Sequence, residues 1–556
     1  MRTPLLALLF GALTLVMAAP WSLHPATRVV IDNPDTHLYA WTLGWDAHAF
    51  ATDPFAIFDA NIYFPYANTL AYSENMIGSA LLAAPIIWLT GDLVLALNLV
   101  LLASCMLCGL GAYVLGRRIG LGTAGAIVAG LVFAFAPTRF FRMSQLHLNA
   151  VQWMPFALAW LHAYFDGGRP RDLRVALGFF TLQALTSGHG AVMLGVAMAA
   201  LAFYRLAWDA PLAPLRRIKD VGVAGVLLLM PAVLVLLPYR RARAEIGLDR
   251  SLERWGVTPE SFLASPSVVH QYLLSLVTDH DLNAAASAFL FPGYLALAFA
   301  CIALWPAPAA RGALARAPEP TGHLARRDVW FYALLTALSL AFFAGGPFDV
   351  WAWVHAWPGF SFIRVPSRFM ILTTLALAVL AGAGFARLTA GATPRATVVA
   401  GTVVSVLLLG EYSAYPFTGV PFRLPAPAIV TWLATQPAPF VVAEVPVPRA
   451  SHGGAFERFQ TAAMLHSTGH WQKTIHGYSG IQPPLSGRVF DELHTFPDDR
   501  SVATLRELGV TVVVVHRPRY PDEVWPGVAS RLQQTAGLRF VHAEADGAVY
   551  AVLSQP

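Results

Sequence analysis

Residues 4–41 read PLLALLFGALTLVMAAPWSLHPATRVVIDNPDTHLYAW, an apolar run followed closely by an acidic and aromatic stretch. The run from Leu5 to Trp21 is close to the ~20 apolar residues that a membrane-spanning helix needs. Carboxylates such as Asp32 and Asp35 are costly at the mouth of a membrane bundle unless they serve a ligand, an ion or a reaction. This stretch therefore marks both a first span, which we expect to remain uncleaved, and a first candidate functional segment.

The composition is that of a membrane protein. Hydrophobic residues make up 56% of the 556 residues and charged residues only 12%, and the mean hydropathy is +0.55. A chain this apolar is expected to cross the bilayer many times. Its net charge of +5 comes almost entirely from Arg, since Lys occurs only at 219 and 473. In a bilayer protein this excess indicates topology and contacts with membrane lipids, and nucleic-acid binding is not expected.

The apolar runs define a topology. Twelve runs lie near 4–22, 76–91, 94–116, 120–137, 149–165, 175–189, 190–207, 221–238, 288–306, 329–346, 369–387 and 396–414. If all twelve spanned from a cytoplasmic Met1, three clusters of basic residues would face outside, against the positive-inside rule. Leaving out 76–91, which is short and contains Pro85, moves these clusters to the cytoplasm. We therefore expect eleven spans, an external loop at 23–93 and an external C-terminus.

The composition changes after about residue 414. Short β-branched runs at 440–445, 510–515 and 548–553 predict strands, and 499–508 predicts a helix capped by Asp or Ser and ended by Gly509. The fold class is thus mainly α. Residues 1–414 are expected to form a transmembrane helix bundle and 415–556 a small extracytoplasmic α/β domain.

The stretch Pro34-Asp35-Thr36-His37-Leu38-Tyr39 resembles the Pro-Asp-Glu-x-x-Tyr opening of the aminoarabinose and protein-mannosyl transferase branches of the GT-C glycosyltransferases. The order of first span, large external loop, bundle and outer domain is also similar to that superfamily. The segments 362–369 (FIRVPSRF) and 476–480 (HGYSG) look like segments of uncharacterised bacterial relatives. The resemblance implies a GT-C-like fold and an enzyme that transfers sugar from a polyprenyl-phosphate carrier.

The resemblance places Asp35 at the catalytic position of the family, as the base that takes the acceptor proton. Asp32 could assist it, bind a metal or be the base itself. From the residues alone, both fit a solvated turn, with Asp35 capping a helix that starts near Thr36. Since Thr36 stands where relatives often have Glu, no cofactor is certain, and a divalent metal ion remains an open possibility.

Cationic groups on the outer side are the expected partners of a lipid phosphate. The candidates are Arg139, Arg142, His147, Arg364 and Arg368. Lipid-headgroup anchoring is the alternative for these arginines. The expected substrate contacts are His37, Tyr39, Trp41 and Glu74, although the aromatic residues also fit a membrane-interface belt.

Other residues were weaker candidates. His189 is expected at an external turn between two glycines. The outer-domain cluster His466, His470, Trp471, His476 and Tyr478 reads as an acceptor-facing surface, because no acidic residue completes a zinc motif within it. Cys105, Cys108 and Cys301 read as small apolar residues.

The sequence thus predicts a membrane glycosyltransferase of inverting type. It would move a sugar from a polyprenyl-phosphate donor to a glycan, lipid or protein acceptor on the periplasmic side of a bacterial inner membrane. A transporter of lipid-linked glycans or a non-catalytic envelope scaffold are the alternatives. A transporter is expected to carry charged residues inside its spans, which are nearly absent here.

Overall fold

The computed structural model describes residues 3–208, 214–247, 257–306, 324–344, 350–357, 360–361, 363–424 and 427–554. Parts of the expected loops 239–287 and 347–368 lie outside these residues, as does Phe362. Two compact units are present. The bundle unit comprises 1–25, 98–234 and 250–419, and the α/β unit comprises 26–97, 235–249 and 420–556.

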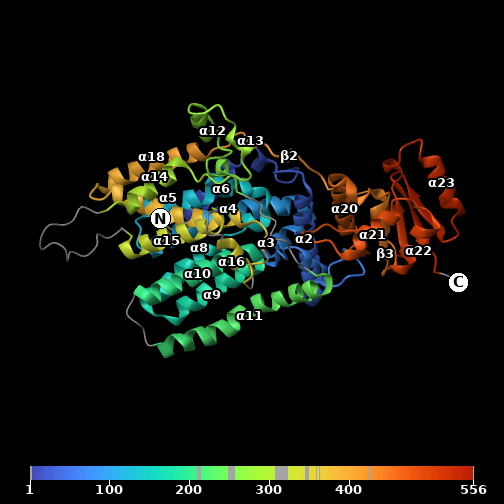
Figure 1. Ribbon diagram of the computed structural model, residues 1–556, viewed down its shortest axis with the longest axis horizontal. Coiled ribbons are helices and arrows are strands. Elements are labelled where there is room, and N and C mark those ends of the chain that lie inside the picture. Colours follow the sequence, from blue (N-terminus) through green and yellow to red (C-terminus); the bar gives the residue numbers. More distant parts are fainter. Residues whose placement is uncertain are drawn as a thin grey trace. The chain divides into compact units, whose positions relative to one another are not determined.

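Neighbouring helices of the bundle unit, such as α8 (Trp153–Gly167) and α9 (Pro170–Thr186), lie side by side (Figure 1). The helices of this unit follow in chain order. They are α1 (Thr3–Met17), α5 (Thr123–Phe135), α6 (Pro137–Phe140), α7 (Leu146–Asn149), α8 (Trp153–Gly167), α9 (Pro170–Thr186), α10 (Gly188–Trp208), α12 (Val268–Ser275), α13 (Leu282–Ala285), α14 (Tyr294–Leu304), α15 (Arg326–Ala341), α16 (Val350–His355), α17 (Met370–Leu388) and α18 (Pro394–Tyr412). Two more helices, α4 (Leu93–Arg118) and α11 (Pro214–Ile246), contribute residues to both units.

Six helical segments among the described residues are long and apolar enough to cross a membrane. They are Leu93–Arg118, Thr123–Ser144, Gly188–Trp208, Gly225–Ile246, Pro366–Leu388 and Pro394–Tyr412. Helices α1, α3 (Ile77–Thr90) and α14 are apolar but shorter. The chain is therefore a multi-pass membrane protein, and the count of eleven spans stays a prediction.

Helix α17 is the centre of the bundle. Its apolar window is 100% buried within the protein, whereas that of α11 is only 6% buried. Helices α5, α14 and α15 pack against α17. Small residues permit the close approach, because a Cβ at Gly125 would lie 2.8 Å from the Gly382 carbonyl oxygen. Close backbone contact through small residues is a common way for helices to pack in membranes.

Gly384 on α17 supplies a stability test. A Cβ at this position would overlap the Phe299 carbonyl oxygen of α14. We expect Gly384→Ala to force the two helices apart, to destabilise the bundle by about 1–3 kcal/mol and to lower its Tm in detergent. Gly178→Ala is the matched control, since nothing lies within 4 Å of a Cβ there. Equal Tm values for the two variants would show that α14 and α17 are not packed as described.

The α/β unit joins the segment 26–97 to the C-terminal residues. Strand β1 (Arg28–Val29) pairs antiparallel with β2 (Val420–Pro421). Its helices are α2 (Pro34–Thr52), α3, α19 (Ala428–Leu433), α20 (Gly454–His466), α21 (Pro484–Leu493), α22 (Asp499–Glu507) and α23 (Trp525–Gln534). Helix α3 packs against α2. It runs through Pro85 and ends at Gly91, whose φ of +70° suits glycine.

A five-stranded sheet forms the core of this unit, in the order β4-β3-β5-β7-β6. Its strands are β3 (Val441–Val445), β4 (Lys473–Thr474), β5 (Val512–Val515), β6 (Leu538–Glu544) and β7 (Gly547–Val552). Strands β4, β3 and β5 are parallel, and β7 and β6 are antiparallel. The three predicted strands are confirmed as β3, β5 and β7. The predicted helix 499–508 is confirmed as α22, which Asp498 caps by accepting from the Ser501 N–H.

Candidate functional site

The acidic stretch of the first loop forms the start of α2. Asn33 is the N-cap, because its side chain accepts from the Thr36 N–H at 2.9 Å, and Pro34 occupies the first helical position. The prediction that Asp35 caps a helix starting near Thr36 is therefore wrong, because Asn33 is the cap and the helix starts at Pro34. Asp35 lies in the first helical turn, where a carboxylate is favoured by the helix dipole.

Asp35 is held by a residue far away in the sequence. The Tyr478 hydroxyl donates to Asp35 Oδ1 at 3.2 Å across 443 residues of chain. Burial first, and then the nearby Asp35 charge, raise the pKa of Tyr478 above its usual value, so its hydroxyl stays a donor. Two segments that the sequence presents separately, 34–39 and 476–480, thus meet at one hydrogen bond. Asp35 itself is half-buried.

Asp32 takes part in a second chain of contacts. Its Oδ1 lies 2.7 Å from His37 Nε2, and His37 Nδ1 lies 3.0 Å from the Thr461 Oγ1 of α20. The Asp32 side chain is 51% exposed, whereas that of His37 is 14% exposed. Asp32 therefore orients His37 from the solvent side. Within the described residues, neither Asp32 nor Asp35 belongs to a group of three potential metal ligands.

Three of the expected substrate residues lie inside the α/β unit. Tyr39, Trp41 and Glu74 are only 3%, 1% and 5% exposed. The Trp41 ring stacks on Trp45 with centroids 6.3 Å apart. These side chains are part of the interior of the unit. Because the Trp41–Trp45 pair is buried there, it does not form an aromatic belt at the membrane interface. Of the four expected substrate contacts, His37 is the one with accessible surface.

Asp46 is a buried acid that the sequence did not single out as a site residue. It is fully buried, and neither carboxylate oxygen has a hydrogen-bond partner among the described residues. Burial raises the pKa of Asp46 well above its usual value. Burial in α2 therefore disfavours the charged form of this side chain.

A cationic cluster forms in the bundle unit from four separate segments. Arg368 lies on the 3₁₀ turn Pro366–Phe369 and donates to Nε2 of His189, in the first turn of α10, at 2.6 Å. The His189 and His147 rings lie 5.1 Å apart. Arg142 donates to Gln145, and its charge interacts repulsively with that of Arg368. We call Arg142, His147, His189 and Arg368 the cationic cluster. His189, a weak candidate in the sequence, belongs to it.

The remaining two arginines of the expected phosphate site differ from the cluster. Arg139 is fully buried and donates to the carbonyl oxygens of Ala134 (2.9 Å) and Asn149 (3.1 Å). Its guanidinium also lies 2.9 Å from the Cys108 sulfur, so this cysteine is more than an apolar filler. These contacts give Arg139 a structural role between α4, α6 and α7. Arg364 is exposed, four residues before Arg368.

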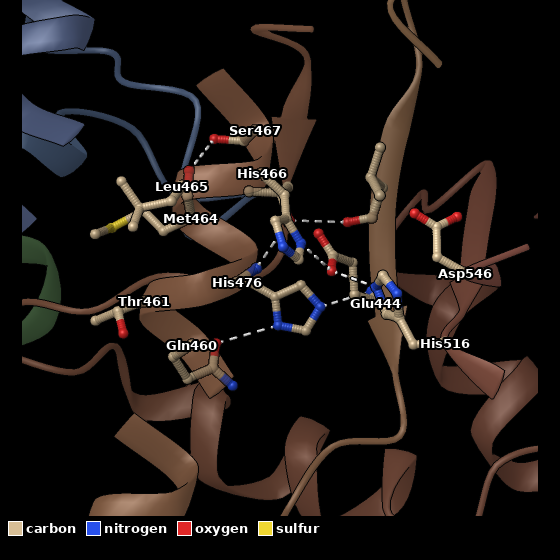
Figure 2. Close-up of polar contacts among 12 residues, drawn as sticks. Glu444, Gln460, Thr461, Met464, Leu465, His466, Ser467, His476, His516 and Asp546 are labelled. Carbon is tan, nitrogen blue, oxygen red and sulfur yellow. Dashed lines mark hydrogen bonds and ion pairs between the residues drawn. The ribbon is translucent and has the colours of Figure 1, made fainter. Parts of the chain in front are cut away.

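Two histidines of the C-terminal segment 466–478 are buried rather than exposed on a surface. His466 and His476 are 2% and 0% exposed, so the expectation of an acceptor-facing cluster was wrong for them. Glu444, on strand β3, accepts from both His466 and His516 (Figure 2). Burial by itself raises the pKa of Glu444, but the two imidazoles outweigh burial and hold that pKa well below its usual value. The acidic partner was missed because it lies outside the histidine-rich segment.

His470 supplies a pH test of this region. Its Nδ1 accepts from the Gln472 N–H at 3.0 Å, and burial lowers its pKa from 6.5 to about 4. Between about pH 6.5 and pH 4, His470 is therefore protonated in the unfolded chain but neutral in the folded chain. We expect stability to be complete above about pH 6.5 and to fall by on the order of 3 kcal/mol as the pH approaches 4.

The variant His470→Asn removes this titration while keeping an acceptor. Unfolding midpoints of the wild type and the variant are measured from pH 7.5 to 4. The difference between them should shrink as the pH falls, because only the wild type loses the contribution of His470. Parallel curves would show that His470 does not carry the pH dependence.

Comparison with known proteins identifies the fold. No protein-family model matches the chain, and no curated protein sequence matches it. The arabinofuranosyltransferase AftD from Mycobacteria superposes with a TM-score of 0.59 at 16% identity, over 100% of this chain and 40% of AftD. ArnT from Cupriavidus metallidurans, solved with undecaprenyl phosphate bound, superposes with a TM-score of 0.50 at 15% identity, over 98% of this chain and 97% of ArnT.

This chain therefore spans less than half the length of AftD and nearly all of ArnT. Both proteins are GT-C glycosyltransferases. At these identities the likeness shows the fold, and the GT-C-like fold expected from the sequence is confirmed.

Proposed function

We propose that this chain, which has the GT-C fold, is a membrane glycosyltransferase that moves a sugar from a polyprenyl-phosphate donor to an acceptor outside the cytoplasm. The observation that carries the proposal is Asp35, presented in the first turn of α2 and oriented by the Tyr478 hydroxyl. The likeness to ArnT, which binds undecaprenyl phosphate, supports the class of donor. We propose a bacterial inner membrane, with the α/β unit on the periplasmic side, as the setting of this reaction.

Asp35 acts as the general base in this proposal. Tyr478 occupies Oδ1, which leaves Oδ2 available to accept the proton of an acceptor hydroxyl. The acceptor oxygen then attacks the anomeric carbon as the bond from that carbon to the phosphate oxygen breaks, and the configuration inverts. The polyprenyl phosphate leaves with the bonding electrons. Asp32 contributes by orienting His37, the residue that we propose contacts the sugar.

The cationic cluster is the proposed phosphate site. Arg368 donates to His189, whose ring neighbours that of His147, and Arg142 is close enough to Arg368 for their charges to interact. Such groups stabilise the charge that develops on a leaving phosphate. We propose that Arg364 supports them at the exposed edge, whereas the buried Arg139 holds the segment 137–149 in place.

The test is transfer of radiolabelled sugar in membranes that contain the chain. A panel of polyprenyl-phosphate sugars is supplied, and label is followed into water-soluble, lipid and protein acceptors, with and without a chelator. We expect one donor to be consumed, and the amount consumed to match the amount of label that appears in one class of acceptor. Movement of intact donor across the membrane without transfer would instead support a transporter.

A further inference from the structure

Three residues from separate elements converge in the interior of the α/β unit. Glu444 lies on β3, His466 is the last residue of α20, and His516 follows β5 directly. Their exposed fractions are 3%, 2% and 4%. Figure 2 shows both imidazoles directed at the Glu444 carboxylate. We call these residues the Glu-His-His cluster.

The sheet topology brings the cluster together. Strands β3 and β5 are parallel neighbours, with Glu444 opposite Val514, so both strands end at the same edge of the sheet. The His516 N–H donates to the Val445 carbonyl at 2.9 Å, which fixes His516 beside the end of β3. Ligands in sheets with parallel strands gather at this carboxyl edge. The cluster therefore occupies a position where such folds place functional groups.

The geometry is close to that of a metal site. His466 Nδ1 lies 2.8 Å and His516 Nε2 2.6 Å from the same oxygen, Glu444 Oε2, and the ligand atoms all lie within 4.8 Å of one another. Tetrahedral zinc with bonds of ~2.1 Å needs ligand atoms ~3.4 Å apart. The two nitrogen–oxygen separations would have to lengthen by about 0.6 and 0.8 Å to admit the ion. Among the described residues this is the group of three ligands close enough to hold a metal.

Hydrogen bonds fix the backbone of Glu444 beside His476. The Glu444 N–H donates to His476 Nε2 at 2.7 Å, and His476 Nδ1 donates to Gln460 Oε1 at 3.1 Å. Both nitrogens of His476 are thus occupied, so this histidine supports Glu444 rather than adding a fourth ligand.

We propose that Glu444, His466 and His516 bind one divalent transition-metal ion, with Zn²⁺ as the best fit. Two imidazoles and one carboxylate suit zinc, whereas calcium and magnesium prefer oxygen ligands alone. A buried carboxylate also needs a positive partner, and the ion supplies it. The ion would tie β3, α20 and the end of β5 together. This site is separate from Asp35 and does not depend on the proposed transfer reaction.

The 556-residue chain in detergent, stripped with chelator, is the material for the test. Titration with Co²⁺ and Zn²⁺ should give one equivalent bound per chain, and Co²⁺ should produce visible absorption of a four-coordinate site. Glu444→Gln, His466→Gln and His516→Gln should each weaken binding at least 100-fold. The control is His542→Gln, which breaks the half-exposed pair that His542 forms with Glu544 at 2.8 Å.

A measurement on the unmodified protein guards against misfolded variants. X-ray absorption of the zinc-loaded chain should show two imidazole ligands, with bonds of about 2.0–2.1 Å. Less than a tenth of an equivalent bound by the wild type would overturn the proposal, as would ligand variants that bind as tightly as His542→Gln. The three residues would then be a hydrogen-bonded carboxylate–imidazole cluster and nothing more.

Discussion

Replacing Asp35 by Asn is expected to lower sugar transfer by about 10²–10⁴-fold, the usual contribution of a positioned general base. Asn has the same shape and can still accept from the Tyr478 hydroxyl, so the fold of the α/β unit should persist. The measurement is the initial rate of label transfer in membranes with matched protein levels. Unfolding midpoints of the two proteins in detergent should agree within about 2 °C.

Two further variants sharpen this prediction. Asp32→Asn should cost much less than Asp35→Asn, because Asp32 is 51% exposed and acts through His37. Tyr478→Phe removes the orienting hydroxyl while keeping the base, so its loss should lie between the two. A rate for Asp35→Asn within twofold of wild type would remove Asp35 from the chemistry and leave it a residue of the helix start.

The second large effect is expected at Arg368. Hydrogen bonds to charged groups contribute about 1.5–3 kcal/mol, so Arg368→Gln should weaken the apparent donor affinity by about 10- to 150-fold. The readout is the KM for the polyprenyl-phosphate sugar, measured separately from kcat. Arg395→Gln is the control, because Arg395 is an exposed residue at the start of α18, outside the cluster.

Coupling with His189 distinguishes a shared phosphate site from independent anchors. Arg368 donates to His189, so their substitutions should be non-additive by 0.5 kcal/mol or more. Arg364→Gln then reports whether the exposed arginine of the same segment also contacts the donor. A donor KM unchanged by Arg368→Gln would show that the cluster does not hold the phosphate.

Local patterns in this sequence predicted local structure well. The β-branched runs became β3, β5 and β7, and the boundaries of α22 came within one residue of those expected from its cap and from Gly509. The GT-C-like fold was also recognisable, from a short motif and the order of segments. These features depend on backbone preferences and hydrophobicity, which act over a few residues.

Contacts between residues far apart in the sequence could not be predicted in the same way. Glu444 meets His516 because β3 lies beside β5 in a particular register, which no local pattern encodes. Arg139 looked like an interfacial cation because it follows an apolar run, yet the short helix α6 keeps its side chain inside. Arg139 and Arg142 are only three residues apart, yet Arg139 is fully buried whereas Arg142 is partly exposed.

The pairing of β1 with β2 carries a consequence for biosynthesis. Asp35 emerges from the ribosome early, but its partner Tyr478 is synthesised 443 residues later. At about 5–20 residues per second, the first loop waits roughly 20–90 s for the strand and hydroxyl that complete it. The acidic stretch must therefore stay soluble and unpaired while the spans are inserted. Premature termination before residue 478 would leave a membrane-inserted chain whose candidate base never acquires its orienting partner.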